Sequence, residues 1–245
     1  MSDAKVTTSG AFDADVRANA GYRYTTNAPL SSVLANRRLT ALTLAMVDLR
    51  GRTVIDVGCG DGTYTHDLFV AGAPALMFGV DATKQAAVLA ATRYASAGPT
   101  LRFAVGDATA LPCRSRRFDI AIVRGLLHHL DDAPRALAEI GRIASEVCVI
   151  EPNGYNPGLK IIERLSRYHR EHGEKSYPAR RIRRWIRELG GTIDREEYAG
   201  LVPFFCPRSI ARALKVAESV VERVPVVRNG ACAVFAVRYR PRSPR

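Results

Sequence analysis

The sequence has 245 residues, of which 47% are apolar, a length that fits one large domain or a domain with a substantial insert. No apolar run reaches the roughly 18 residues of a transmembrane helix, and the first 30 residues lack the apolar core of a secretory signal, so we expect a cytoplasmic protein. The five cysteines are scattered and form no CxxC pair, so we expect no disulfide scaffold. The net charge is +12, and residues 151–245 carry 20 basic against 10 acidic side chains, which fits either an anionic acceptor or arginines spread over solvated faces.

The N-terminal residues 1–50 are expected to form a helical lid segment ahead of the main domain. Ser31 or Ser32 can cap a helix over residues 33–49, which Gly51 follows closely. Tyr24 lies in the polar and aromatic stretch before that cap. We expect Tyr24 either to cover a ligand as part of the lid or to serve an ordinary packing role.

Strands and helices alternate through the middle of the chain, which predicts an α/β layered fold with a largely parallel sheet. The helices are expected where apolar residues recur at helical spacing, and the strands where β-formers run together. Strands are expected at 54–57, 75–80, 101–105, 118–123 and 146–150, and helices at 62–70, 84–96 and 133–143.

Residues 51–245 are expected to form the main domain, with a helical insert at about 152–178 that begins after the fifth strand. Further elements are expected as a helix at 161–172, an arginine-rich helix at 179–189, an amphipathic helix after Pro207, and strands at 192–198 and 231–239. The stripe of Ile210, Leu214, Ala217 and Val221 on the amphipathic helix is expected to be core, with transient membrane contact as the alternative. His169 and His172, one helical turn apart in the insert, are expected to face water, so no metal site is predicted.

The stretch Val54-Ile-Asp-Val-Gly-Cys-Gly-Asp-Gly-Thr-Tyr-Thr65 places three glycines directly behind a run of β-formers. In a parallel sheet, a glycine loop between the first strand and its helix is a nucleotide-binding position. A dinucleotide-binding fingerprint has a glycine at the position occupied here by Thr63. In addition, the carboxylates of Asp56 and Asp61 would repel a pyrophosphate. S-adenosylmethionine, which carries a sulfonium and an ammonium and no phosphate, suits this loop better.

Four further motifs follow the glycine loop in order, and together they resemble the motifs of class I S-adenosylmethionine-dependent methyltransferases. The loop motif is Asp56-Val-Gly-Cys-Gly-Asp-Gly62, and the four that follow are Gly79-Val-Asp81, Gly106-Asp107-Ala108, Phe118-Asp119 and Leu127-His-His-Leu130. The resemblance spans roughly residues 50–151. It implies a Rossmann-like sheet of seven strands, mostly parallel with an antiparallel last strand, and helices on both faces.

The resemblance also implies a set of cofactor-binding residues. Gly58, Gly60 and Gly62 would let the backbone approach the methionine part of S-adenosyl-L-methionine, and Asp81 would accept hydrogen bonds from the ribose hydroxyls. Asp107, with the Ala108 amide, would meet the adenine. Asp56 either contacts the cofactor or orients the loop amides, Asp81 is alternatively a helix cap, and Asp107 alternatively a turn residue. Arg124, at the end of the fourth strand, and Tyr24 complete this set.

His128 and His129 are the candidate catalytic residues. Both follow the fourth strand, on the rim where the methyl group would be delivered, and a histidine can remove the proton of a hydroxyl nucleophile near neutral pH. The alternative is that the pair packs the loop and bonds its backbone. The Asn/Asp/Ser-Pro-Pro-Tyr/Phe motif of many nucleic-acid methyltransferases is missing after this strand, and Glu151-Pro-Asn153, which is reminiscent of it, follows the fifth strand instead.

The sequence therefore predicts a methyltransferase that acts on a small molecule, most favourably at a hydroxyl oxygen, with carbon and nitrogen as alternative acceptor atoms. The basic C-terminal part is compatible with an acceptor that is anionic or linked to a carrier. An NAD(P)-dependent oxidoreductase and a nucleic-acid-directed methyltransferase remain as alternatives. The low aromatic content of 7%, without an interleaved basic and aromatic patch, disfavours a nucleic-acid partner. The sequence does not indicate an oligomeric state.

Overall fold

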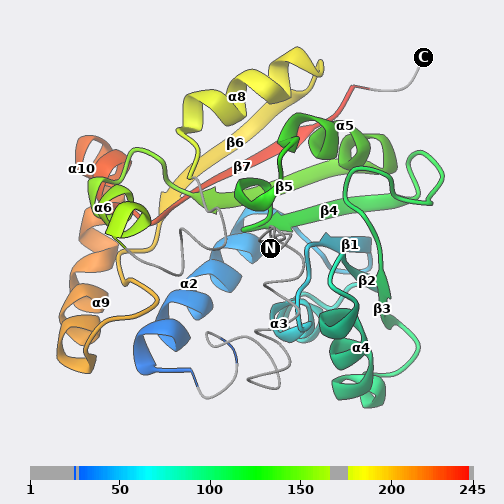
Figure 1. Ribbon diagram of the computed structural model, residues 1–245, viewed down its shortest axis with the longest axis horizontal. Coiled ribbons are helices and arrows are strands. Elements are labelled where there is room, and N and C mark those ends of the chain that lie inside the picture. Colours follow the sequence, from blue (N-terminus) through cyan, green and yellow to red (C-terminus); the bar gives the residue numbers. More distant parts are fainter. Residues whose placement is uncertain (1–24, 26–27, 166–175, 243–245) are drawn as a thin grey trace, which may run out of the picture.

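The computed structural model describes residue 25 and residues 28–165 and 176–242. Seven strands of this part form one mixed sheet in the order β3-β2-β1-β4-β5-β7-β6 (Figure 1). The strands are β1 (Thr53–Val57), β2 (Leu76–Asp81), β3 (Leu101–Val105), β4 (Phe118–Arg124), β5 (Ala144–Pro152), β6 (Thr192–Ala199) and β7 (Val234–Arg240). β1 to β5 are parallel and β7 runs antiparallel between β5 and β6. The predicted seven-stranded sheet with its antiparallel last strand is confirmed.

Helices cover both faces of this sheet, as predicted. On one face lie α5 (Ala133–Ile143) and α8 (Ala179–Glu188), and on the other lie α2 (Leu30–Met46) and α3 (Thr63–Gly72). Side chains alternate between the faces along each strand, so Ile55 joins the first core and Val54 the second. The central strands are apolar throughout because both faces are covered.

Four other α-helices of the described residues lie at the two ends of the sheet. α4 (Lys84–Arg93) lies against β3 and β2, and a short 3-10 turn, η1 (Ala95–Ala97), follows it. α6 (Pro157–Leu165), α9 (Arg208–Arg223) and α10 (Pro225–Ala231) lie at the opposite end of the sheet, on the left of Figure 1. The helix α10 was not predicted, and the predicted 161–172 helix is described only as far as Leu165.

The predicted cap of the N-terminal helix is wrong. α2 begins at Leu30, and Pro29 occupies its N-cap position without a side-chain hydrogen bond. Ser31 and Ser32 lie inside the first turn, where both hydroxyls donate to the Phe204 carbonyl, at 2.8 and 2.5 Å. A distant loop therefore satisfies these hydroxyls, and a pattern of neighbouring residues cannot reveal that partner.

The predicted core stripe of the amphipathic helix is confirmed only in part. In α9, Ile210 is 48% exposed and Ala217 is exposed, whereas Ala211 and Glu218 are the buried residues. Leu214 and Val221 of the stripe are half-buried, and Val221 packs against the larger core. The main helix contacts of α9 are with α2 and α10. None of the described helices is both long and apolar enough to cross a membrane.

Candidate active site

The glycine loop connects β1 to α3 at the position where the strand order reverses. β1 pairs with β2 on one side and with β4 on the other, so the loop opens at the switch point of the sheet. Gly58, Gly60 and Gly62 all have positive φ, at 83°, 56° and 75°. A side chain at Gly62 would also lie 2.8 Å from the ring of Phe103. The glycines are therefore needed both for the turn and for close packing behind it.

Asp81, the predicted ribose ligand, ends β2 directly beside this loop. Its Oδ2 accepts a hydrogen bond from the Gly60 amide at 2.9 Å, and its Oδ1 accepts one from the Thr83 amide at 2.8 Å. Asp81 thus fixes the glycine loop and the start of α4 together. Contact between Asp81 and the ribose hydroxyls stays a prediction.

Asp56 lies buried at the end of β1, behind the loop. Its Oδ2 accepts a hydrogen bond from the Thr65 hydroxyl of α3 at 2.6 Å. Burial raises the pKa of Asp56 to about 6, although the Thr65 hydroxyl and the charge of Arg124 act in the opposite direction. Both predicted roles, orienting the loop and contacting the cofactor, are compatible with this position.

Arg124 lies at the end of β4 and connects the sheet to α2. Its Nη2 donates to Asn36 Oδ1 at 2.7 Å, and its guanidinium lies 4.1 Å from the centre of the Tyr64 ring. These contacts hold Arg124 near Asp56, whose charge it partly balances. Direct contact with the cofactor stays a prediction for Arg124.

The predicted adenine ligands follow β3. Asp107 Oδ1 accepts hydrogen bonds from the amide and the hydroxyl of Thr109, both at 2.8 Å, and these bonds lower the pKa of Asp107. The predicted turn role is therefore present in the structure, while adenine contact remains a prediction. Ala108 is buried and its side chain belongs to the core.

Asp61 does not act as the free carboxylate that the sequence argument assumed. It forms an ion pair with Arg93 Nη1 of α4 at 3.2 Å and also accepts the Thr25 hydroxyl at 2.6 Å. The charge of Asp61 is thus balanced within the protein, and Asp56 and Asp81 are the acidic groups behind and beside the loop. Its contact with Thr25 joins the N-terminal segment to the loop, although Tyr24 itself lies outside the described residues.

His128 and His129 lie in the 3-10 turn η2 (Leu127–His129), which follows β4. The Nδ1 atom of the buried His128 lies 2.8 Å from Glu151 Oε2, and the two imidazole rings are 3.9 Å apart between centroids. Glu151, near the end of β5, also accepts the amides of Leu126 and Leu127 at 2.9 and 2.8 Å. Its carboxylate therefore fixes both the turn and the imidazole.

Glu151 is the site residue that motif reasoning missed. The available signal was an acidic residue directly after the apolar run 147–150 of β5, next to the parallel strand that the histidines follow. The structure thus brings the loop 58–62, Asp81, Arg124, His128 and Glu151 to the carboxyl ends of neighbouring strands. The insert histidines His169 and His172 lie outside the described residues.

Comparison with known proteins shows which domains and folds this arrangement resembles. A family described as a methyltransferase domain matches residues 54–146, which include the loop, Asp81, Asp107 and both histidines. The structure of magnesium protoporphyrin IX methyltransferase from Synechocystis PCC 6803, with bound S-adenosylhomocysteine, covers 97% of this chain and 98% of its own, with a TM-score of 0.65 at 15% identity.

Residues 54–146 of this chain therefore match a methyltransferase domain, and the fold is that of S-adenosylmethionine-dependent methyltransferases. Ubiquinone biosynthesis O-methyltransferase from Azorhizobium caulinodans is 27% identical over 138 residues, or 56% of this chain and 50% of that protein. Phthiotriol/phenolphthiotriol dimycocerosates methyltransferase from Mycobacterium leprae is 33% identical over 113 residues, or 46% of this chain and 39% of that protein. The methyltransferase chain thus spans about half the length or less of these curated relatives. S-adenosyl-L-methionine is the cofactor of this family, which favours the methyl donor over a dinucleotide.

Proposed function

We propose that this methyltransferase transfers the methyl group of S-adenosyl-L-methionine to a hydroxyl oxygen of a small-molecule acceptor. The observation that carries the proposal is the 2.8 Å hydrogen bond between His128 Nδ1 and Glu151 Oε2. A buried imidazole held by a carboxylate is a common arrangement for a general base, and an acceptor hydroxyl needs one. The name of the ubiquinone-biosynthesis relative, an O-methyltransferase, supports the same acceptor atom.

The residues at the loop fit the proposed cofactor. The three glycines with positive φ give a side-chain-free approach for its methionine part, and the carboxylates of Asp56 and Asp81 supply negative charge and ribose acceptors near it. Asp107 and the Ala108 amide would hold the adenine after β3, and Arg124 would order the loop through Asp56. When bound, the cofactor supplies a methyl group that is activated for displacement by its positively charged sulfur.

The protein's contribution to the reaction is then orientation and proton removal. A hydrogen bond from Nδ1–H of His128 to Glu151 fixes the imidazole in the tautomer with its lone pair on Nε2. That lone pair would accept the proton of the acceptor hydroxyl, and the negative Glu151 would stabilise the imidazolium that forms. Orientation alone supplies up to about 7 to 11 kcal/mol in reactions of this kind.

The positive charge of residues 151–245 supports a particular class of acceptor. Residues 151–245 carry 20 basic and 10 acidic side chains, and Arg180 and Arg181 are exposed at the start of α8. The Arg181 guanidinium lies about 5 Å from both the Tyr177 and the Trp185 rings, at 5.0 and 5.1 Å. These features support an acceptor that is anionic or linked to an anionic carrier. A cytoplasmic location stays a prediction.

The test is a donor-consumption screen with hydroxylated aromatic and lipid-like acceptors, neutral and anionic, followed by variants of the histidine turn. With the best acceptor, His128→Gln and Glu151→Gln are expected to lower kcat at least 100-fold and to leave the affinity for S-adenosylhomocysteine within threefold. His129→Gln, the matched neighbour, is expected to lose less because the Glu151 carboxylate holds the imidazole of His128. Full kcat in His128→Gln across the pH range would contradict the role of His128 as base.

A further inference from the structure

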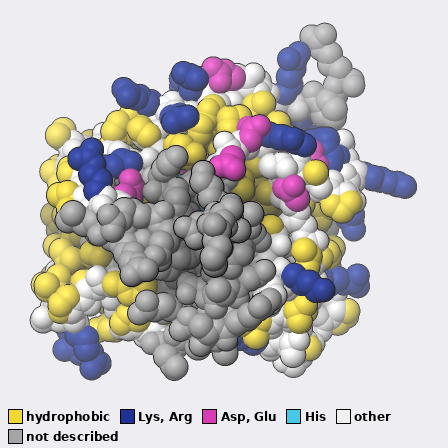
Figure 2. Space-filling model, viewed as in Figure 1, with side chains coloured by type: hydrophobic (Ala, Val, Ile, Leu, Met, Phe, Trp, Pro, Cys, Tyr) yellow, Lys and Arg dark blue, Asp and Glu magenta, His cyan; other side chains and the backbone are white. Residues whose placement is uncertain are grey.

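An apolar surface faces solvent along α9 and α10, at the margin of the molecule. Val216 in α9 and Val226 in α10 are 81% and 88% exposed. The other members are Phe205, Ile210, Val220, Val224 and Val227, which are all exposed. Figure 2 shows hydrophobic side chains along the margin at which Figure 1 places these two helices. We call this set the outer apolar surface.

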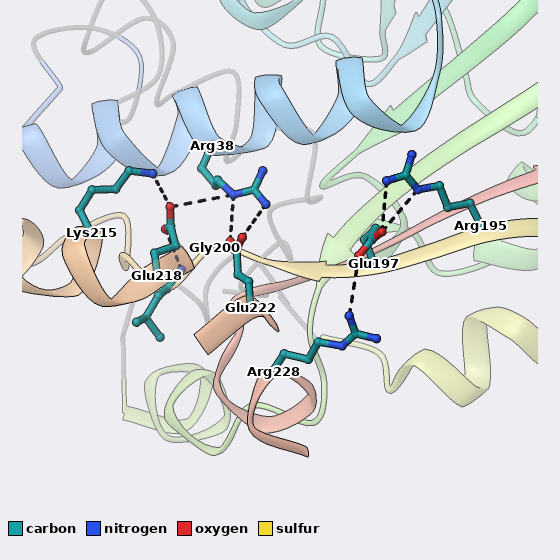
Figure 3. Close-up of polar contacts among 9 residues, drawn as sticks. Arg38, Arg195, Glu197, Gly200, Lys215, Glu218, Glu222 and Arg228 are labelled. Atoms are coloured by element: carbon teal, nitrogen blue, oxygen red, sulfur yellow. Dashed lines mark hydrogen bonds and ion pairs between the residues drawn. The ribbon is translucent and has the colours of Figure 1, made fainter. Parts of the chain in front are cut away.

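The orientation of α9 is fixed by its two carboxylates, which point inward. Arg38 of α2 donates to Glu222 through Nε at 2.9 Å and Nη2 at 2.7 Å (Figure 3). The Glu218 carboxylate is buried, pairs with Lys215, and accepts the Leu201 amide at 3.0 Å. These bonds secure α9 to α2 by its polar side. Ile210, Val216 and Val220 consequently face outward.

The same arrangement leaves only positive charge on the outward side. Glu218 and Glu222 are the only acidic residues of α9 and α10, and both are used internally. Arg208, Arg212 and Arg223 are exposed, and within the described residues they form no ion pair with a carboxylate. Exposed valines flanked by arginines form a helix surface whose charge complements an anionic layer with an apolar interior.

We propose that the outer apolar surface docks on an anionic lipid bilayer. Valine side chains of α9 and α10 would enter the level between headgroups and acyl chains, and the long arginine side chains beside them would reach lipid phosphates. The inference concerns association with one leaflet, in keeping with helices that lie in the interface rather than span it.

The location of α10 connects this surface to the candidate active site. The side-chain amide of Asn153 donates to the carbonyls of Asn229 and Cys232, at 2.9 and 3.0 Å. Asn153 lies two residues after Glu151, so the docked face adjoins the strand end that holds the candidate base. The bilayer would thus present an amphiphilic acceptor near the rim; this consequence rests on the proposed function, whereas lipid binding does not.

The experiment is sedimentation of the full chain with two kinds of vesicle, one of phosphatidylcholine alone and one of phosphatidylcholine with about 30% phosphatidylglycerol. The wild type is expected to bind the anionic vesicles and to lose most of that binding in about 0.5 M salt, where charges are screened within a few ångströms. Val216→Asp/Val226→Asp is expected to reduce binding at least tenfold. The same change at Val88 of α4, which is 54% exposed, is the control and is expected to bind as the wild type does.

A second pair of variants tests the charge separately. Arg212→Gln/Arg223→Gln is expected to weaken vesicle binding at least fivefold. Arg180→Gln/Arg187→Gln removes the same amount of charge from α8 and is expected to bind vesicles as the wild type does. No binding to anionic vesicles, or equal losses in both arginine pairs, would overturn the proposal. So would a dimer in sedimentation velocity that Val216→Asp/Val226→Asp dissociates without any vesicle binding, since that result assigns the surface to contact between two copies. Binding of S-adenosylhomocysteine, measured on the same samples, distinguishes failure here from failure of the proposed function.

Discussion

Replacing Asp56 by asparagine is expected to stabilise the cofactor-free protein at neutral pH. Burial raises the pKa of this carboxyl from 3.8 to about 6. Such a difference corresponds to about 3 kcal/mol of unfolding free energy. Below pH 3.8 the carboxyl is protonated in both states and contributes fully; its contribution is lost as the pH rises through about 6, where the folded state must carry a buried charge. Asparagine keeps an acceptor for the Thr65 hydroxyl and carries no charge.

The assay is urea unfolding of both proteins from pH 4 to pH 8, followed by the fluorescence of Trp185, the single and buried tryptophan. The stability difference is expected to be near zero at pH 4 and to reach up to about 3 kcal/mol above pH 7. Asp119→Asn is the control of opposite sign, because hydrogen bonds from the Thr53 amide and hydroxyl lower the pKa of Asp119. A wild-type pH slope in Asp56→Asn, or a loss of stability at pH 7.5, would refute the reasoning.

Three further predictions concern the packing around the site. Gly62→Ala is expected to cost about 2 to 4 kcal/mol in urea unfolding, since it adds a clash with Phe103 to the left-handed backbone, while Gly51→Ala, with φ 68° and open space, should cost only about 1 kcal/mol. Arg38→Gln is expected to lower the free energy of unfolding by about 3 kcal/mol because it leaves the Glu222 carboxylate without its cationic partner. Loss of the exposed Arg184 pair should change the free energy of unfolding by less than about 1 kcal/mol, and equal effects would contradict the burial argument. A thiol reagent is expected to label two cysteines of the folded protein and the remaining three only after unfolding, and rapid labelling of all five would be inconsistent with the packing of the buried set, Cys59, Cys148 and Cys232.

The regular centre of the fold could be predicted because local and global signals agree there. β3 and α5 begin and end at the predicted residues, and the loop after β1 has the three left-handed glycines that its composition indicates. In such a sheet, a strand that ends on an acidic residue places it at the carboxyl edge. Asp56 and Asp81 are therefore found where the pattern puts them.

The periphery could not be predicted in the same way, because its partners are distant in sequence. The apolar stripe of α9 has helical spacing, but spacing does not say which side is covered. That side is chosen by Arg38, which lies in α2 and pairs with Glu222. Likewise, the sequence alone does not show that the charge of Asp61 is paired with Arg93, which lies on the next helix.

The candidate base shows the same limit at the site itself. His128 can be proposed from its place after β4, yet its capacity as a base depends on Glu151, which comes from the neighbouring strand. Register between two parallel strands brings these residues together: Arg124 is opposite Ile150 in the ladder, so the residues that follow each meet at the same edge. A single sequence gives the two strands but does not give that register.

Titration calorimetry of the purified full chain tests the central claim most directly. The account predicts saturable binding of one S-adenosylhomocysteine or S-adenosylmethionine per chain at pH 7.5, weakened at least tenfold in Asp81→Ala, and no binding of NADH or NADPH. Saturable binding of a nicotinamide dinucleotide, with no heat from either methyl-donor ligand, would contradict it.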